Sequence, residues 1–362
     1  MKLHLILIGN KYIYNSSLQN YILRTIEKNG KQIDKITYFK KSDNSLFLYL
    51  EEELNKKIKL LIVTSKQHFS TVGKLISTAT ADNQILKEGM LIPSNAAVYE
   101  ERSYLLSYKN SEVNVLQVDE GERLPQILLN TSAASAAVHI FDEDENTINT
   151  ILQPIAQTYD VSFSATQIVQ GWLRVDISSN KYGDISNFMH AAKKLLPSKM
   201  IPSANVFEYI IETLSRAQKK ITFAESCTGG LLTYMFTKHN GASKILEGSL
   251  VTYSNFLKEN WLAVSEDILQ KHGAVSAEVV EEMSEGALSV SSADYSISIS
   301  GIAGEGGGSD EKPVGTVYIG VRSKENHQEK RCFFQGDRNY IQEQSALYAV
   351  KMLISLDKEM FF

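Results

Sequence analysis

Apolar and polar residues along the first third of the chain follow two different periods. Short apolar runs predict β-strands, and longer stretches with one apolar stripe predict amphipathic helices between them. The predicted strands are Leu3–Gly9, Lys35–Phe39 and Leu60–Thr64, and the predicted helices are Ser16–Asn29 and Ser45–Lys57. Strands and helices that alternate at this spacing favour a doubly wound, mostly parallel sheet. A less regular region follows, from Leu91 to Gln126.

A second α/β pattern begins near Ala136, and a third begins at Asn205. The second contains strands Ala137–Phe141, Val161–Thr166 and Trp172–Ser178 and helices Thr147–Tyr159 and Gly183–Leu196. The third contains strands Ile221–Ala224, Gly248–Tyr253, Tyr295–Ser300 and Gly315–Val321, a helix ending near Lys238, and helices Val206–Gln218, Asn255–Leu262, Ala277–Val290 and Arg338–Leu356. Pro197 and Pro202 bracket a linker between the two patterns. We therefore predict three α/β domains, at 1–130, 131–200 and 201–362.

Composition narrows the class of protein. A length of 362 residues suits two or three domains, and a content of 43% hydrophobic residues excludes a disordered chain. Residues 201–362 carry 15 basic and 21 acidic side chains, which argues against direct contact with nucleic acid. The only cysteines, Cys227 and Cys332, exclude a disulfide scaffold and suit a reducing compartment. The apolar start Leu3–Ile8 is too short for a signal peptide, so we expect a cytoplasmic protein that does not bind membranes.

One junction between a predicted strand and a predicted helix has the features of a nucleophile turn. Ser226 directly follows an apolar strand, where a sharp turn exposes a side chain above the sheet. Thr228, Gly229 and Gly230 come next, and their backbone N–H groups are candidate donors to an oxyanion. The alternative is a simple helix cap, since Ser and Thr are common at helix starts. Cys227 is the rival nucleophile.

A second junction supplies a candidate base. Tyr253 ends one predicted strand, and Lys258 lies in the first turn of the helix that follows it. A desolvated lysine with a lowered pKa can take the proton of a serine, and a tyrosine hydroxyl can relay or position that proton. The alternative is that Lys258 is an ordinary surface cation. No histidine is near either junction in sequence, although folding can bring His272 closer.

A glycine-rich loop, Gly301–Gly308, follows Ser300 at the end of another predicted strand. Successive glycines let backbone amides approach a ligand closely, but neither a dinucleotide-binding fingerprint nor a Walker lysine is present. A flexible surface loop is the alternative. Arg338, at the start of the last predicted helix, offers a cation for a phosphate.

Several short motifs in the last third of the chain resemble the CinA C-terminal domain. They follow the family's order from about Asn205 to Leu356. The motifs are AESCTGG at 224–230, VTYSN at 251–255 with Lys258, HGAVS at 272–276, SGIAG with GGS and EKPVGTV between 300 and 317, and GDR at 336–338.

The resemblance implies an amidohydrolase that converts nicotinamide mononucleotide to nicotinate mononucleotide and releases ammonia. Ser226 matches the family's nucleophile, and Tyr253 and Lys258 match the residues that complete its site. On this reading neutral Lys258, assisted by Tyr253, takes the Ser226 proton, and no metal or cofactor is required. The residues expected to contact the substrate are Glu225, Thr228, Gly229, Gly230, Ser300, Gly301, Gly304, Gly306 and Arg338. The family usually forms dimers, so we expect a homodimer.

The first two predicted domains resemble, by pattern alone, the MoaB/MogA-like domain and the KH-like module of full-length CinA proteins. The family's first domain cleaves ADP-ribose with a metal ion, and it carries glycines and carboxylates after its first and third strands. This chain has Gly9-Asn10-Lys11 after the first strand, and its 64–73 segment lacks the family's glycine and aspartate motif. We therefore expect that the first domain keeps its fold and has lost this activity.

Three alternative functions remain open from the sequence. One is a module that binds nucleotides through both halves without turnover. A second is an interaction protein of the competence or DNA-damage response. A third is an ADP-ribose pyrophosphatase that acts through the first domain.

Overall fold

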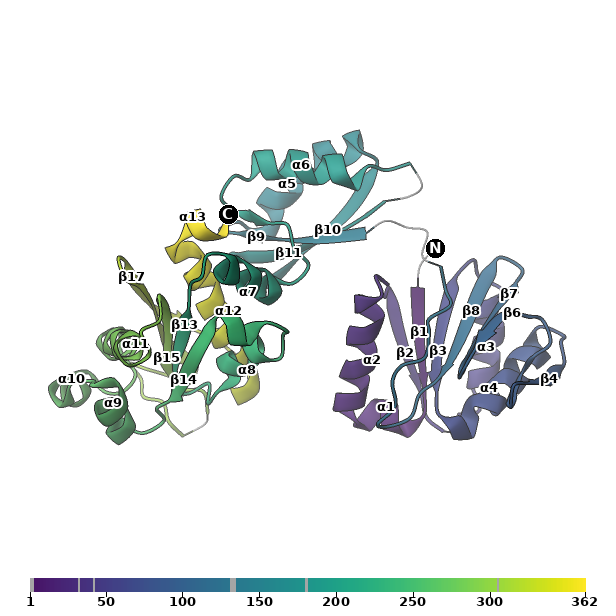
Figure 1. The fold of residues 1–362 in the computed structure, drawn as a ribbon, viewed down its shortest axis with the longest axis horizontal. Coiled ribbons are helices and arrows are strands. Elements are labelled where there is room, and N and C mark those ends of the chain that lie inside the picture. The colour runs from purple at the N-terminus through teal and green to yellow at the C-terminus, as the bar shows by residue number, and fades with distance from the viewer. Residues whose placement is uncertain (1–2, 32, 42, 131–134, 180–181, 305) are drawn as a thin grey trace. The chain divides into compact units, whose positions relative to one another are not determined.

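The computed structural model describes residues 3–31, 33–41, 43–130, 135–179, 182–304 and 306–362. The chain divides into two compact units, Met1–Ser135 and Ala136–Phe362 (Figure 1). Both units are α/β structures with mixed sheets. The second unit contains two separate sheets. The sequence predicted three domains, whereas the chain divides into two compact units, the second of which spans the second and third predicted domains. Among the described residues, no helix is both long and apolar enough to span a bilayer.

The first unit is built on a six-stranded sheet in the order β2-β1-β3-β8-β7-β6. Four neighbouring strands are parallel, and two antiparallel strands complete one side. The parallel strands are β2 (Lys35–Phe39), β1 (Leu3–Ile8), β3 (Lys59–Thr64) and β8 (Ser111–Gln117). The antiparallel strands are β7 (Ser103–Tyr108) and β6 (Ala96–Glu100). The first three strands lie within a residue or so of their predicted positions.

Helices cover both faces of this sheet. Alternate residues of β1 point to opposite faces, so Leu5 and Leu7 pack with α2 (Ser16–Lys28), while Ile6 and Ile8 pack with α3 (Leu46–Leu54) and α4 (Lys66–Ala79). The unit also contains the short helix α1 (Asn10–Tyr14) and the hairpin β4 (Gln84–Lys87) and β5 (Met90–Pro93).

Helix α4 was not predicted from the sequence. Its buried residues Phe69, Val72 and Ile76 have helical spacing, but the segment is rich in Ser and Thr and has Gly73 in its interior, all of which lower helix propensity. A Cβ at Gly73 would lie 2.7 Å from Gln84 Nε2, the end of a flexible side chain that can move aside. The burial of Phe69, Val72 and Ile76 is what stabilises the helix. Tertiary contact therefore outweighs local preference in this helix.

The second unit begins with a four-stranded sheet in the order β10-β11-β9-β12. Helices α5 (Glu145–Thr158) and α6 (Ile185–Leu195) contribute Ile148, Leu152 and Phe188 to the core that they share with this sheet. The strands are β9 (Ser135–Phe141), β10 (Val161–Val169), β11 (Trp172–Ser179) and β12 (Met200–Ile201). The predicted order of three strands and two helices matches β9 to α6. The fourth strand, β12, was not predicted: it lies between Pro197 and Pro202, where a linker was expected, and it pairs with β9.

The other sheet of the second unit has the order β14-β13-β15-β16-β17. Strand β13 is parallel to both of its neighbours, whereas the last two strands are antiparallel. The strands are β13 (Ile221–Glu225), β14 (Leu246–Val251), β15 (Tyr295–Gly301), β16 (Thr316–Ser323) and β17 (His327–Phe333). Strand β17 escaped prediction because it is an edge strand of mostly charged and exposed residues, with only Cys332 buried.

Two groups of helices enclose this sheet (Figure 1). One face packs against α7 (Val206–Arg216), α8 (Leu231–Thr237) and α12 (Arg338–Leu356). The other packs against α9 (Asn255–Leu262), α10 (Glu266–His272) and α11 (Ala277–Ser291). The unit also has a short 3-10 turn, Ala242–Lys244, and the C-terminal helix α13 (Lys358–Phe361).

Helices α9 and α11 approach each other very closely. A Cβ at Gly286 of α11 would lie 2.0 Å from the Leu262 carbonyl oxygen at the end of α9. Only glycine therefore allows this distance between the two backbones.

Candidate active site

The candidate active site is formed where three parallel strands end. Ser226 directly follows β13, Thr252 directly follows β14, and the glycine-rich loop begins at the end of β15. Parallel strands bring their carboxyl ends to one edge of a sheet, which is where α/β proteins usually bind ligands. Hydrogen bonds hold these ends together: the Ser226 N–H donates to the Ile299 carbonyl and the Thr252 N–H to the Glu225 carbonyl, each at 2.9 Å.

The structure brings Ser226 and Lys258 together. Ser254 caps α9 by accepting a hydrogen bond from the Leu257 N–H at 3.2 Å, and this places Lys258 in the first turn. The Lys258 Nζ lies 3.0 Å from Ser226 Oγ and donates to the Thr252 carbonyl at 2.7 Å. Lys258 is only 1% exposed, so it is not a surface cation.

Burial changes the acidity of this lysine. Desolvation lowers the pKa of Lys258 to about 8, since the charged form loses its hydration inside the protein. A substantial fraction of the amine is therefore neutral slightly above neutral pH and is able to accept a proton.

The thiol of Cys227, next to Ser226, is in contrast shifted towards its unreactive form. Cys227 is 5% exposed, and burial raises its pKa to about 12, so the reactive thiolate is scarce. Its carbonyl accepts a hydrogen bond from Gln342 Nε2 at 2.6 Å, which ties the turn to α12. Gln342 was missed in the sequence, although it lies one helical turn after Arg338 and therefore on the same face. These observations favour Ser226 over Cys227 as the nucleophile.

Glu225 does not contact the site as a substrate ligand would. It is fully buried, and its carboxylate accepts hydrogen bonds from the backbone N–H groups of Gly230, Leu232 and Thr233 at 2.9–3.1 Å. The Thr233 hydroxyl also donates to it, at 2.5 Å. We correct the expectation accordingly: Glu225 satisfies the free amides at the start of α8 and thereby positions the Ser226 turn.

The same bonds revise which amides are available to an oxyanion. The Gly229 N–H donates to the Ser226 carbonyl at 3.1 Å, and the Gly230 N–H is occupied by Glu225. Within the described residues, the Thr228 N–H donates to no backbone carbonyl, the Cys227 N–H contacts only its own thiol, and the buried Thr228 hydroxyl has no partner. The N–H groups that remain for an oxyanion are therefore those of Cys227 and Thr228, whereas the expected donors were those of Thr228, Gly229 and Gly230. Gly229 and Gly230 have φ values of +57° and +99°, so the turn itself requires them.

Tyr253 is placed differently from the expectation. Its side chain is 60% exposed, and its hydroxyl accepts a hydrogen bond from Arg338 Nη2 at 3.0 Å. Lys258 reaches only its carbonyl oxygen, at 3.5 Å. The expected hydroxyl assistance to Lys258 is therefore absent from this arrangement. Gly304 also lies against Arg338, because a Cβ there would be 2.6 Å from its Nη1.

The origin of the glycine-rich loop is fixed by packing. Ser300 is buried, and its hydroxyl donates to the Ala274 carbonyl at 2.6 Å. A Cβ at Gly301 would lie 2.7 Å from the Val317 side chain. These two residues were expected to contact substrate, and in the structure they anchor the loop. Gly306 is exposed at the tip, with φ +85°.

The remaining candidates lie outside this arrangement. His272 Nδ1 lies 3.2 Å from the Glu278 carboxylate, and His272 shows no contact with Ser226 or Lys258 in the described part of the chain. One other cluster, Glu281, His327 and Glu329, has ligand atoms within 4.8 Å of one another, the geometry of a metal site. Arg322 lies 3.7 Å from Glu281 and already balances part of its charge.

This geometry defines an α/β protein with a buried serine–lysine pair at the carboxyl ends of parallel strands. Comparison with known proteins identifies it further, since residues 203–356 match the family described as the CinA C-terminal domain. Residues 203–356 therefore belong to the CinA family, and full-length CinA-like proteins are homologues of this chain.

Individual relatives match different shares of the chain. A CinA-like protein from Thermotoga maritima is 48% identical over 146 residues, which are 40% of this chain and 36% of the relative. The chain thus spans about a third of the length of such relatives at this level of identity. A CinA-like protein from Pseudothermotoga lettingae is 28% identical over 322 residues, covering 84% of this chain and 79% of the relative. A solved structure, a competence/damage inducible protein from Agrobacterium tumefaciens, is 34% identical and covers 42% of this chain and 93% of its own, with a TM-score of 0.41.

Proposed function

We propose that the C-terminal part of this protein hydrolyses the carboxamide of nicotinamide mononucleotide, giving nicotinate mononucleotide and ammonia. The observation that carries this proposal is the buried Lys258 amine, 3.0 Å from the Ser226 hydroxyl. A serine hydroxyl is a weak nucleophile until a base removes its proton, and this amine is placed to do so. Membership of the CinA family supports the choice of substrate.

The hydrogen bonds of Lys258 explain how it acts as a base. A charged lysine has three N–H donors, and its neighbours here are the Thr252 and Tyr253 carbonyls and the Ser226 hydroxyl. When the amine loses one proton, the two remaining N–H groups continue to donate to the carbonyls. The lone pair is then free to accept the proton of Ser226.

The reaction proceeds in two balanced steps. Ser226 Oγ attacks the carboxamide carbon while its proton passes to Lys258, and the N–H groups of Cys227 and Thr228 stabilise the oxyanion. The C–N bond then breaks, and the leaving nitrogen takes the proton from Lys258 to form ammonia. Water, activated by the same amine, hydrolyses the acyl ester and frees Ser226.

The exposed end of the site suits the ribose phosphate. Arg338 offers guanidinium donors beside Gly304, and its partner Tyr253 adds a hydroxyl. Guanidinium groups bind phosphate with two parallel hydrogen bonds. Arg338 therefore contributes mainly to the affinity for the nucleotide and little to the rate of the chemical step.

The full-length chain is expected to release ammonia from nicotinamide mononucleotide with a pH-dependent rate. Because only neutral Lys258 acts as a base, kcat/KM should rise with pH and reach half of its plateau near the lysine pKa of about 8. An enzyme-coupled ammonia assay across pH 6–10 measures this profile. A rate that stays level across this range would contradict the assigned base.

A matched variant separates binding from chemistry in the same assay. Arg338→Met should raise KM by roughly 10–100-fold, as expected when one charge-assisted contact is lost, and should leave the pH midpoint unchanged. Cys227→Ala should keep both parameters near their original values, because the thiol takes no part.

The first unit, we also infer, has a MoaB/MogA-like scaffold without its metal chemistry. Asp119 and Glu120 follow β8, beside the ends of β1 and β3, but the Lys11 ammonium contacts both carboxylates at 2.5 and 3.1 Å. The Lys11 ammonium thus occupies the position between the two carboxylates at which they would bind a divalent cation. The Ser226→Ala chain should not hydrolyse ADP-ribose with Mg²⁺ or Mn²⁺ present, and release of ribose 5-phosphate in that assay would overturn this proposal.

A further inference from the structure

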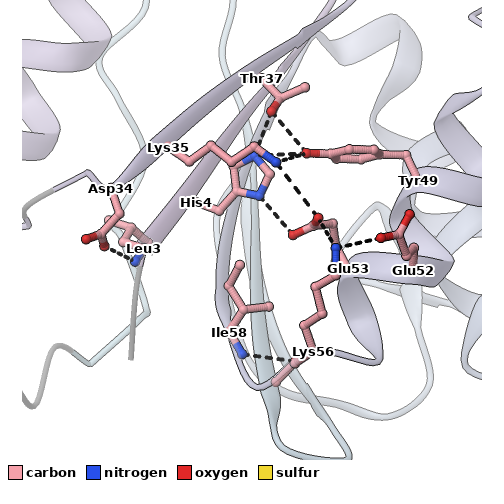
Figure 2. Close-up of polar contacts among 11 residues, drawn as sticks. Leu3, His4, Asp34, Lys35, Thr37, Tyr49, Glu52, Glu53, Lys56 and Ile58 are labelled. Carbon is pink, nitrogen blue, oxygen red and sulfur yellow. Dashed lines mark hydrogen bonds and ion pairs between the residues drawn. The ribbon is translucent and has the colours of Figure 1, made fainter.

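A second group of polar side chains lies in the first unit, at the amino ends of β1 and β2 and beneath α3 (Figure 2). It is separate from the serine–lysine site, which belongs to the other unit. Its members are His4, Lys35, Thr37, Tyr49, Glu53 and Lys56.

The centre of this group is a chain of hydroxyl, imidazole and carboxylate. Thr37 Oγ1 lies 2.8 Å from His4 Nε2, and His4 Nδ1 lies 3.1 Å from Glu53 Oε2 (Figure 2). His4 and Glu53 are almost fully buried, with side-chain exposures of 1% and 4%. The same order of groups activates the nucleophile in serine hydrolases, where it is recognised by geometry and not by sequence position.

The charges fix the direction of the hydrogen bonds. Burial raises the pKa of Glu53, but hydrogen bonds from Lys56 and His4 outweigh it, so the net shift is downward and the carboxylate is ionised. Burial lowers the pKa of His4, so its ring is neutral at neutral pH. A carboxylate can only accept, so Nδ1 carries the ring proton and Nε2 accepts from Thr37.

Tyr49 and Lys35 extend this chain towards solvent. Lys35 Nζ donates to Tyr49 Oη at 2.8 Å, and Tyr49 Oη lies 3.1 Å from Thr37 Oγ1. Tyr49 Oη also lies 3.3 Å from His4 Nε2, but the Thr37 hydroxyl is the nearer donor to that nitrogen, at 2.8 Å. When Thr37 donates to His4, Tyr49 is left to donate to Thr37, and the threonine oxygen keeps a lone pair.

The threonine end of this chain lies at an edge of the sheet. Strand β2 is at the edge of the sheet, and Thr37 is half-buried there, whereas His4 lies on the next strand inward. The Lys35 side chain beside it is 54% exposed and brings a positive charge to the opening. A ligand therefore meets the hydroxyl first and a cation next to it.

We infer that Thr37 is a second nucleophile, which accepts an acyl group from small activated esters that carry a negative charge. Thr37 Oγ1 attacks the ester carbonyl carbon, and its proton passes to His4 Nε2. The ester C–O bond breaks, and the leaving oxygen takes that proton as an alcohol or phenol. Water hydrolyses the acyl-threonine by the same route, and Glu53 positions the imidazole without contacting the acyl group.

The test uses the full-length chain with the Ser226→Ala substitution, so that its result is independent of the site in the second unit. The chain is incubated with mono-p-nitrophenyl succinate, and peptide mass spectrometry locates the succinyl group. We expect succinylation at Thr37 and release of p-nitrophenol, and both should fall at least 100-fold in Thr37→Val. Valine suits an edge strand, so this variant should fold as judged by circular dichroism.

Two further variants separate an activated nucleophile from a merely exposed hydroxyl. Thr37→Ser should keep the acylation within a few-fold, and Glu53→Gln should slow it by at least 10-fold. Absence of the adduct on Thr37, or an equal rate of acylation in Glu53→Gln, would overturn the inference.

The pH profile tests the positioning role of Glu53. Acylation should decline at acid pH as His4 gains a proton. Since Glu53 raises the pKa of His4 by charge and hydrogen bonding, Glu53→Gln should move this decline to lower pH. A midpoint that does not move would contradict the role of Glu53. The other groups with charge or protons around the imidazole are Lys35, Lys56, Tyr49 and Thr37.

Discussion

Lys258→Met should abolish ammonia release while making the second unit more stable. The activity falls because Ser226 loses its base, and general-base assistance is typically worth a factor of 10²–10⁴. The stability rises because a buried ammonium, which costs free energy in the native state, is replaced by an apolar side chain of similar length. The gain in the free energy of unfolding should be about 3 kcal/mol at pH 7, the scale that a shift of more than two pKa units implies.

The sign of the pH dependence follows from the same shift. The folded-state pKa of about 8 lies below the value near 10.4 in the unfolded chain, so the unfolded state binds more protons between these two pH values. The wild-type protein should therefore gain stability as pH rises through this window, relative to Lys258→Met. Urea unfolding of both proteins at pH 7 and pH 10 measures the difference. A destabilised variant, or one that still releases ammonia, would be inconsistent with a buried catalytic lysine.

Ser226→Ala should lower kcat for ammonia release by at least about 10³-fold, since the acyl-enzyme route is lost altogether. Binding should be almost unaffected because Arg338, Tyr253 and the glycine-rich loop are untouched. Isothermal titration with nicotinamide mononucleotide should give a Kd within a few-fold of the wild-type value. The matched control is Cys227→Ala, the adjacent residue in the same turn, which should retain turnover.

Two results would sink the assignment of Ser226. One is ammonia release by Ser226→Ala at the wild-type rate. The other is loss of turnover in Cys227→Ala with Ser226 intact and the fold unchanged by circular dichroism, because it would give the nucleophilic role to the thiol.

The sequence was sufficient to locate the strands that lead into the candidate site. It was not sufficient to predict which hydrogen bonds the side chains make there. Apolar runs located β13 and β15 to within a residue, but β14 was predicted two residues too late, so Tyr253 lies beyond its end. The role of Glu225 was not predictable, because a carboxylate next to a nucleophile resembles a ligand until its acceptors are seen to be filled by the α8 amides. The direction of the Tyr253 side chain was equally hidden, since it depends on where α12 begins.

The errors in the fold have similar physical causes. Helix α4 is stabilised by the burial of Phe69, Val72 and Ile76, which outweighs the low helix propensity of its Ser, Thr and Gly residues, and β17 is an exposed edge without the alternation of a half-buried strand. The chain of Thr37, His4 and Glu53 joins three separate elements, so no local motif marks it.

The proposed reaction depends on a backbone contact at Gly286 of α11, away from the reacting groups. Helix α9 carries Lys258 near its start, and its far end rests on the bare backbone of α11. Any larger residue at Gly286 would push α9 away from α11. Because the helix moves as a rigid body, the Lys258 amine near its other end would move too. The distance between base and nucleophile is thus set partly by the absence of a side chain on a helix that takes no part in the chemistry.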